Sequence, residues 1–324
     1  MTAQRDARWM GAALALAERG RARTAPNPNV GCVIVRDGIV VGRGWTQPGG
    51  RPHAEAMALA QAGKKSRGAT CYVTLEPCAH VSPRGPACAD SLIASGVARV
   101  VVALRDPDPR TDGAGLARLA AAGIAAESGL CADQAARSMA GFLTRRRAGR
   151  PHVTLKLATS LDGCIALGDG TSRWITGPEA RAHAHLERSR HESILVGRGT
   201  MVADAPALDV RLQGLESRGP RRVVLTGDRG FACAGWQAIA SPAAIADLAG
   251  DHLLVEGGAQ TAAAFLRAGL VDRLLLYRAP ILIGGGMAAL GDIGVTDLGQ
   301  AHGRWHRHDA RQLGRDRVEV YEAA

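Results

Sequence analysis

The chain contains few aromatic residues: phenylalanine, tryptophan and tyrosine make up 3% of its 324 positions. Its cores must therefore consist mainly of alanine, valine, leucine and isoleucine. No run approaches the roughly 18 uninterrupted apolar residues that a membrane-spanning helix needs. The charged residues 1–8 are not followed by an apolar segment of the signal-peptide type. Internal repeats and low-complexity segments are also lacking. We therefore expect a globular, cytoplasmic protein without a membrane partner.

Cysteine occurs seven times, an odd number for a long chain without an export signal. This count argues against a disulfide framework and favours either metal ligation or inert burial. The formal net charge of +10 favours anionic partners such as phosphorylated metabolites, dinucleotides or nucleic acid. A basic composition that only keeps the protein in solution explains the charge equally well, so both interpretations stay open.

The length and the hydrophobic pattern predict two α/β domains, which we place at residues 1–148 and 149–324. Helix and strand patterns alternate in both halves, as in layered α/β architectures. The basic segment 144–151 contains glycine and proline, and we interpret it as a solvated linker at the domain junction. A nucleic-acid patch is the alternative, but the arginines there lack interleaved aromatic residues.

The predicted helices and strands are placed by apolar spacing and by turn residues. Helices are expected at 6–19, 54–62, 87–95, 115–122, 178–190 and 259–268. Strands are expected at 31–35, 39–42, 70–75, 99–104, 124–127, 152–158, 193–196, 222–225, 252–256, 273–277 and 317–321.

The strongest chemical signal combines Pro52-His-Ala-Glu55 with Glu76-Pro-Cys78 and Cys88. A catalytic zinc ion takes three protein ligands and a water whose pKa it lowers toward 7. His53, Cys78 and Cys88 are the candidate ligands. Glu55 follows His53 by two residues and is the candidate acid–base group. We expect Cys78 at a helix N-terminus, where the helix dipole favours a thiolate.

This arrangement resembles the signature of zinc-dependent nucleobase deaminases. It departs from that signature because nine residues, not two, separate Cys78 from Cys88, and His80 in this loop is a competing ligand. Burial of the cysteines as small core residues is the alternative, but the ordered set with its flanking residues makes it a weak one. The other cysteines show no partner spacing and are expected to be inert; they are Cys32, Cys71, Cys131, Cys164 and Cys233.

Longer motifs make the resemblance more specific and extend it through nearly the whole chain. In the first half they are Asn27-Pro-Asn-Val-Gly-Cys-Val-Ile-Val35, Thr74-Leu-Glu-Pro-Cys-Ala-His80 and Ala103-Leu-Arg-Asp-Pro-Asp-Pro109. In the second half they are Leu155-Lys-Leu-Ala-Thr-Ser-Leu-Asp-Gly163, Ser172-Arg-Trp-Ile-Thr176, Thr200-Met-Val-Ala-Asp204 and Val255-Glu-Gly-Gly258. Together they resemble the bifunctional riboflavin-biosynthesis deaminase–reductases. Thr46 stands where that family usually has a histidine.

The resemblance implies a cytidine-deaminase-like α/β/α domain followed by a dihydrofolate-reductase-like α/β domain. It implies zinc-dependent removal of the 2-amino group from a phosphorylated diaminopyrimidinone ribotide, followed by NADPH-dependent reduction of the ribosyl arm to ribityl. The expected partners are thus one Zn²⁺, NADPH and the ribotide, without nucleic acid, and we expect a homo-oligomer.

The resemblance further implies a set of ligand contacts. The expected substrate contacts are Asn27, Lys156, Ser172, Arg188, Leu208, Arg211 and Glu256. The expected cofactor contacts are Ala158, Trp174, Thr200, Asp204, Gly257 and Gly258. Arginine forks suit a phosphate, and a glycine pair between a strand and a helix suits a pyrophosphate. A lone lysine such as Lys156 is more often structural.

The remaining histidines are expected to be solvated, and metal binding is the alternative for His302, His306 and His308 near the C-terminus. His183, His185 and His191 lack partnered carboxylates, so we expect them at the surface. His302, His306 and His308 are also expected to be solvated.

Two other functions account for part of the pattern. A nucleic-acid deaminase acting on tRNA, with an RNA-binding second half, shares the zinc chemistry and uses the positive charge. However, the second half lacks aromatic RNA-recognition motifs. A zinc-stabilised binding protein without catalysis shares the ligands but gives Glu55 no role.

Overall fold

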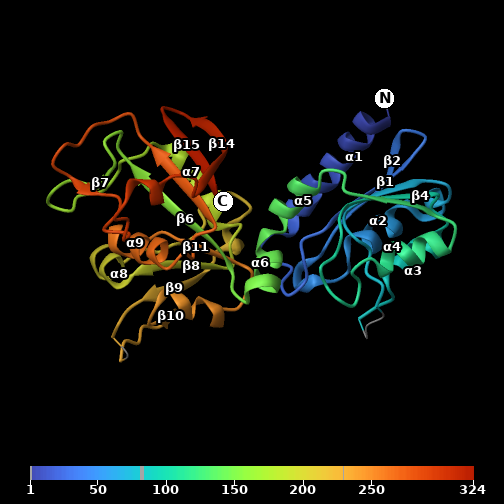
Figure 1. Cartoon of the computed structure of the whole chain (residues 1–324), viewed down its shortest axis with the longest axis horizontal. Coiled ribbons are helices and arrows are strands. Elements are labelled where there is room, and N and C mark those ends of the chain that lie inside the picture. Colours follow the sequence, from blue (N-terminus) through green and yellow to red (C-terminus); the bar gives the residue numbers. More distant parts are fainter. Residues whose placement is uncertain (1, 81–83, 229) are drawn as a thin grey trace. The chain divides into compact units, whose positions relative to one another are not determined.

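A computed structural model describes residues 2–80, 84–228 and 230–324. It divides the chain into two compact units, residues 1–143 and 144–324 (Figure 1). Each unit has its own sheet and its own hydrophobic core. Within the described residues, none of the helices is both long and apolar enough to cross a membrane.

The first unit is an α/β/α sandwich in which the sheet order is β2-β1-β3-β4-β5. Its strands are β1 (Gly31–Arg36), β2 (Ile39–Trp45), β3 (Thr70–Leu75), β4 (Arg99–Leu104) and β5 (Ala125–Ser128). Its helices are α1 (Thr2–Ala17), α2 (Ala54–Ala62), α3 (Cys88–Ser95), α4 (Ala114–Ala121) and α5 (Ala132–Ser138), and α6 (Ala140–Ala148) crosses into the second unit. β1 and β2 pair in antiparallel orientation, and β3, β4 and β5 pair in parallel.

Glycines allow the helices of the first unit to pack closely on its sheet. A Cβ on Gly31 would lie 1.9 Å from the Ala13 carbonyl oxygen of α1, and one on Gly44 would lie 2.1 Å from the Ala54 carbonyl oxygen of α2. Since no other residue fits so near a helix backbone, these positions require glycine. The close fit places the N-terminus of α2 directly beside the sheet.

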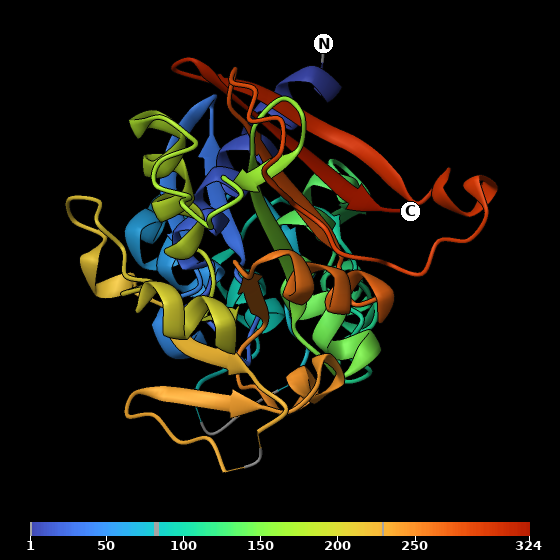
Figure 2. The ribbon, with the colours of Figure 1, turned by 90° about the vertical axis from the view of Figure 1, so that its left-hand side faces the viewer.

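The second unit contains a larger mixed sheet of order β10-β9-β8-β11-β6-β12-β15-β14 and a small ribbon of β7 and β13. The strands are β6 (His152–Thr159), β7 (Cys164–Ala166), β8 (Ser193–Gly197), β9 (Arg221–Leu225), β10 (Trp236–Ile239), β11 (His252–Val255), β12 (Arg273–Arg278), β13 (Met287–Ala288), β14 (Trp305–Leu313) and β15 (Asp316–Ala323). The helices are α7 (Pro178–Arg188), α8 (Arg198–Asp204) and α9 (Ala259–Arg267). Figure 2 shows the β14–β15 hairpin as two long red strands.

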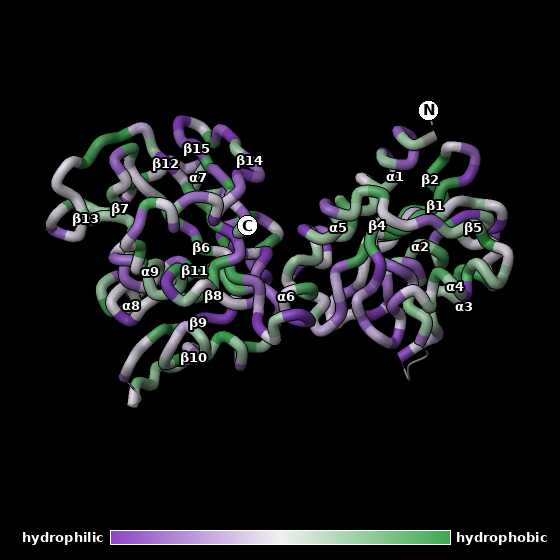
Figure 3. Tube along the Cα trace, in the orientation of Figure 1, coloured by the Kyte–Doolittle hydropathy of each residue, from purple (hydrophilic) through white to green (hydrophobic). Residues whose placement is uncertain are grey.

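The central strands of the second sheet are buried on both faces, and Figure 3 shows β8 and β11 as hydrophobic. Leu195 packs on one face with Phe265 of α9, whereas Ile194 and Val196 pack on the other with Met201 of α8. Such continuous apolar runs are typical of parallel strands covered on both sides. At its carboxyl end β8 continues directly into α8, whereas β11 is followed by the loop 256–258 that precedes α9.

The predicted solvated linker at 144–151 is wrong in its first half, because Thr144 to Ala148 belong to α6. Arg145 is not solvated: its guanidinium donates to the carbonyl oxygens of Ala246, Leu248 and Gly250. A cation near the C-terminus of a helix is favourable, and here it also binds three carbonyl groups. Arg145 is thus held by the segment around Leu248 and is not part of a solvated linker.

Candidate active sites

Three predicted zinc ligands of the first unit lie together. The ligand atoms of His53, Cys78 and Cys88 are all within 4.8 Å of one another. His53 Nδ1 is 3.3 Å from the Cys88 sulfur and 3.7 Å from the Cys78 sulfur. Cys78 and Cys88 are buried, and His53 is half-buried. One imidazole nitrogen and two sulfurs form a donor set that suits Zn²⁺.

Each ligand sits at the end of a secondary-structure element. His53 is the N-cap of α2, Cys78 follows the carboxyl end of β3, and Cys88 is the first residue of α3. The prediction that Cys78 begins a helix is wrong, since Cys88 holds that position. The Cys88 backbone amide nevertheless donates to the Cys78 sulfur at 3.3 Å. Hydrogen bonds from Cys88 and His53 lower the pKa of the Cys78 thiol to about 4, against the effect of its burial.

His80, considered as a competing ligand, is not part of the cluster found among the described residues. Residues 81–83 of the same loop lie outside the described residues.

Glu55 lies in the first turn of α2, and its side chain is almost fully buried. Burial raises the pKa of this carboxyl group to about 7, while the charge of His53 opposes the shift. A buried carboxyl group beside the ligand cluster is placed to exchange protons with a reacting group. Asn27 lies on the other side of His53, with its Nδ2 3.0 Å from Nε2 and donating to the Gly50 carbonyl oxygen. Asn27 therefore orients the imidazole through Nε2, the ring nitrogen that faces away from the two cysteine sulfurs.

Glu76 has a structural role that the sequence interpretation missed. Its buried carboxylate accepts four backbone N–H groups, from Asp106, Gly113, Gly115 and Leu116. These bonds hold the loop 106–113 and the start of α4 against the segment that carries Cys78. The sequence signal for this role is an acidic residue directly before Pro77-Cys78. This signal does not indicate which backbone amides the carboxylate binds.

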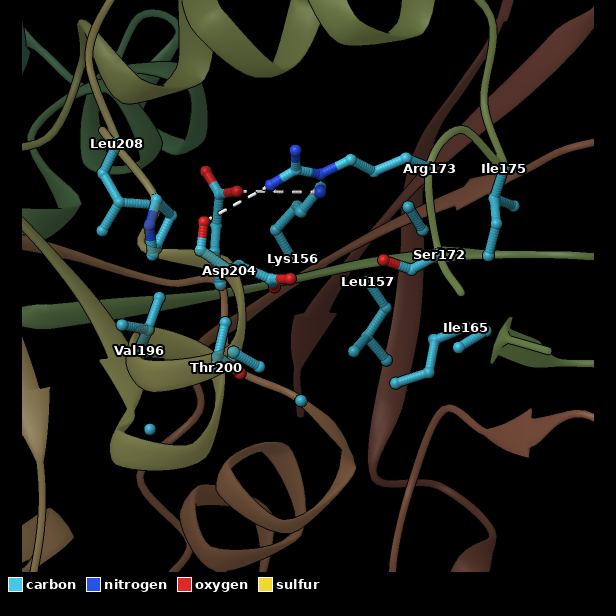
Figure 4. A pocket seen from close by; sticks show the side chains of 18 of the residues that line it. Lys156, Leu157, Ile165, Ser172, Arg173, Ile175, Val196, Thr200, Asp204 and Leu208 are labelled. Carbon is cyan, nitrogen blue, oxygen red and sulfur yellow. Dashed lines mark hydrogen bonds and ion pairs between the residues drawn. The ribbon is translucent and has the colours of Figure 1, made fainter. Parts of the chain in front are cut away.

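A cavity of about 1060 Å³ opens in the second unit and brings the predicted reductase residues together. All twelve predicted ligand contacts of this unit line it: Lys156, Ala158, Ser172, Trp174, Arg188, Thr200, Asp204, Leu208, Arg211, Glu256, Gly257 and Gly258. Figure 4 shows Thr200, Asp204 and Leu208 on one side of Lys156, and Ser172 on the other. The sequence prediction therefore located one contiguous site from residues more than 100 positions apart.

A charged network forms one wall of this cavity. Glu256 accepts two hydrogen bonds from Arg188, at 2.8 and 2.9 Å, and lies 3.7 Å from Lys156 Nζ. Its side chain is only 7% exposed. Burial alone would raise the pKa of Glu256, but Lys156 and Arg188 outweigh this effect and lower it to about 2. Glu256 therefore stays ionised and holds both cations in place.

The histidines near α7 correct an expectation. His191 is buried, and His183 and His185 are half-buried, so none lies freely at the surface. His183 Nδ1 is 2.7 Å from the Tyr277 hydroxyl, and His185 Nδ1 is 3.0 Å from the Asp209 carbonyl oxygen. No carboxylate pattern marks His183 and His185 in the sequence because their partners are a hydroxyl and a carbonyl group on other elements. His302, His306 and His308 are exposed as expected.

Both units match known families. Residues 3–104 match the family described as the cytidine and deoxycytidylate deaminase zinc-binding region. Residues 151–230 and 239–318 match the RibD C-terminal domain.

Curated relatives cover almost the whole chain. The riboflavin biosynthesis protein RibD of Escherichia coli (strain K12) is 42% identical, over 86% of this chain and 89% of the relative. The chain belongs to the RibD family. The RibD of Mycobacterium tuberculosis (strain ATCC 25618 / H37Rv) is 41% identical, over 95% of this chain and 94% of its own length.

Solved structures of RibD proteins share the fold. Acinetobacter baumannii RibD, form 1, superposes with a TM-score of 0.88 at 36% identity and 99% coverage of both chains. A Thermotoga maritima structure, described as a diaminohydroxyphosphoribosylaminopyrimidine deaminase/5-amino-6-(5-phosphoribosylamino)uracil reductase, gives a TM-score of 0.87 at 29% identity and full coverage. Membership of the RibD family confirms the predicted fold class, with a deaminase-like unit followed by a reductase unit, and it confirms that the chain is an enzyme.

Proposed function

We propose that this chain catalyses two successive steps of riboflavin biosynthesis. The substrate is 2,5-diamino-6-(5-phosphoribosylamino)pyrimidin-4(3H)-one, which the first unit deaminates hydrolytically and whose ribosyl arm the second unit then reduces with NADPH. The observation that carries the proposal is the presence of two separate, complete sites in a RibD chain: the zinc-type cluster in one unit and the cavity in the other. We assign deamination to residues 1–148 and reduction to 149–324.

The residues of the first site fit a zinc ion held by His53, Cys78 and Cys88. When bound, zinc supplies the Lewis acidity that activates water for attack on the amino-bearing ring carbon. Glu55 takes the two protons of the attacking water in turn at its carboxylate, passes the first to the ring nitrogen and passes the second to the amino group, which leaves as ammonia. Asn27 keeps His53 oriented, and the resemblance to the family assigns it a substrate contact.

In the second site the nicotinamide cofactor supplies the hydride, and the protein binds and orients both reactants. Gly257 and Gly258 precede α9, whose N-terminal amides suit a pyrophosphate. Trp174 is 65% exposed on the cavity wall and offers a flat face to a ring. Thr200, Asp204 and Ala158 complete the cofactor side.

The substrate side has two arginines with different roles. The Arg188 guanidinium already binds Glu256 through two nitrogens and the Asp209 carbonyl oxygen through the third. We therefore infer that Arg188 fixes Glu256 and that the more exposed Arg211 meets the substrate phosphate. Lys156, Ser172 and Leu208 lie around the ribosyl arm.

The test is incubation of the full chain with the diaminopyrimidine ribotide, followed by mass analysis. Without NADPH we expect exchange of one amino group for oxygen, and with NADPH a further gain of two hydrogens. Release of ammonia without consumption of NADPH would contradict the second activity. A nucleic-acid deaminase is the alternative that this assay excludes, together with an RNA shift assay at physiological salt, where we expect no specific binding.

We further propose that the enzyme works in the cytoplasm as a homo-oligomer. The seven cysteines are all free, including the exposed Cys233, which suits a reducing compartment. Size-exclusion chromatography with light scattering measures the oligomeric state.

A further inference from the structure

Tyr277 is a buried neighbour of Lys156, which lines the reductase cavity. It lies on β12, where its register partner on β6 is Ala158, two residues after Lys156. Since side chains two residues apart share a face of a strand, Lys156 and Tyr277 lie on the same face of the sheet. Lys156 Nζ lies over the Tyr277 ring, 5.9 Å from its centroid. This separation is within the range of a cation–π interaction.

The Tyr277 ring is fixed in place at its other end. Its side chain is 1% exposed and packs with Leu275, Ala180 and Val318. Its hydroxyl is 2.7 Å from Nδ1 of His183 on α7. Burial and the negative charges of Glu187 and Glu256 raise the pKa of Tyr277, so the hydroxyl keeps its proton. Burial lowers the pKa of His183, so a neutral hydroxyl and a neutral imidazole share this hydrogen bond.

Lys156 thus has two partners that together restrict its long, flexible side chain. Glu256 attracts the ammonium group from the side, at 3.7 Å, and the Tyr277 ring face lies against it. A lysine side chain has many rotamers, so one exposed contact alone would leave it mobile. Lys156 is 21% exposed and faces the cavity, where its ammonium group is available to substrate.

We infer that Tyr277 is a positioning residue for the reduction: its ring, fastened by its hydroxyl to His183, holds the Lys156 ammonium group in place beside Glu256. The inference rests on the proposed reductase function. Tyr277 acts only through Lys156, since its own hydroxyl points to α7.

The first test compares Tyr277→Leu, which removes the ring, with Tyr277→Phe, which removes only the hydroxyl. We expect kcat for reduction to fall roughly tenfold in Tyr277→Leu and by no more than about threefold in Tyr277→Phe. The Kd for NADPH should not change in either variant. Unchanged kcat in Tyr277→Leu would overturn the inference.

The second test asks whether the effect passes through Lys156. In a Lys156→Ala background, Tyr277→Leu should cause no further loss of kcat, because the group that the ring holds is already gone. An equal fractional loss in both backgrounds would show that Tyr277 only supports the fold and would overturn the inference.

A third test does not depend on whether Tyr277→Leu folds. It starts from Tyr277→Phe and compares this variant with proteins that carry 4-fluorophenylalanine or pentafluorophenylalanine at the same position. The fluorinated rings keep their shape but have a weaker negative face. We expect kcat to decrease stepwise along this series, and equal values would contradict the cation–π contact. Wild-type enzyme that fails to oxidise NADPH would contradict the proposed function itself, whereas active wild type with equal variants contradicts only the role of Tyr277.

Discussion

The Glu76 carboxylate accepts the backbone amide of Gly115 at 3.0 Å, at a point where no side chain fits. A Cβ on Gly115 would lie 2.1 Å from the Pro77 carbonyl oxygen, in the peptide that leads to Cys78. A hydrogen bond therefore holds the start of α4 against the Cys78 segment. The two backbones can approach this closely only because Gly115 has no side chain.

We accordingly expect Gly115→Ala to lower the free energy of unfolding by about 2 kcal/mol, because backbone must move to admit the methyl group. Deamination and bound zinc should fall with it, measured by ammonia release and metal analysis. Gly11→Ala is the matched control: Gly11 is in α1 with open space around it, so this change should stabilise the unit by about 1 kcal/mol. Normal zinc content and stability in Gly115→Ala would contradict the steric argument.

Replacement of Glu55 by Gln separates catalysis from metal binding. Gln keeps the shape but cannot take up and release a proton, so deamination should fall by at least about 100-fold. Zinc content, measured on the purified protein, should stay at one ion per chain, because Glu55 is not a ligand. Glu127→Gln is the control, since this exposed carboxylate lies on β5 and pairs with Arg99. Wild-type ammonia release by Glu55→Gln would rule out the assigned proton transfer.

A methyl group at Gly257 should block cofactor binding. A Cβ there would lie 2.4 Å from the Thr261 Cβ, so the peptide before α9 must shift away from its position. We expect the NADPH Kd of Gly257→Ala to rise at least tenfold, measured by fluorescence titration. Gly199→Ala adds a methyl group to the same cavity wall with no atom within 4 Å and should change the Kd much less. If Gly257→Ala and Gly199→Ala raised the NADPH Kd equally, the steric clash with Thr261 would not explain the effect.

The ionised Glu256 should make stability depend on acid pH. Its pKa is near 4.5 in an unfolded chain and about 2 in the folded protein, so the folded state favours the deprotonated form. The resulting stabilisation, on the order of 3 kcal/mol, is fully present above pH 4.5 and is lost as the pH falls toward 2. In urea unfolding, the wild type should exceed Glu256→Gln in stability at pH 7, and this difference should shrink between pH 4.5 and 2.5. If the stability difference between the wild type and Glu256→Gln stayed constant over that range, the ion pairs of Glu256 would not be its cause.

The sequence predicted most elements because their apolar periods are clear. Helix α2 and strands β3 and β4 have the predicted bounds, and α7 begins with Pro178 at its first turn as expected. The grouping of the candidate site residues could be predicted because they lie in short sequence motifs such as Pro52-His-Ala-Glu55 and Val255-Glu-Gly-Gly258.

Interactions between distant elements could not be predicted. The arginine run near Arg145 was assigned to a solvated linker because its carbonyl partners, around Leu248, are 100 residues away. His191 carries no sequence mark of its burial beside His252. Strand β14 was also missed: it is an edge strand with mostly exposed side chains, so it lacks the apolar alternation that marks a half-buried strand.

The two sites draw on separate stretches of the chain: His53, Glu55, Cys78 and Cys88 all precede residue 143, whereas the cavity lining begins at Lys156. A lesion in one site therefore leaves the other intact on the same polypeptide. Two preparations, one impaired in deamination by Glu55→Gln and the other impaired in reduction by Gly257→Ala at NADPH concentrations below its raised Kd, should complement each other in a single tube, with the deaminated ribotide diffusing from one molecule to the next.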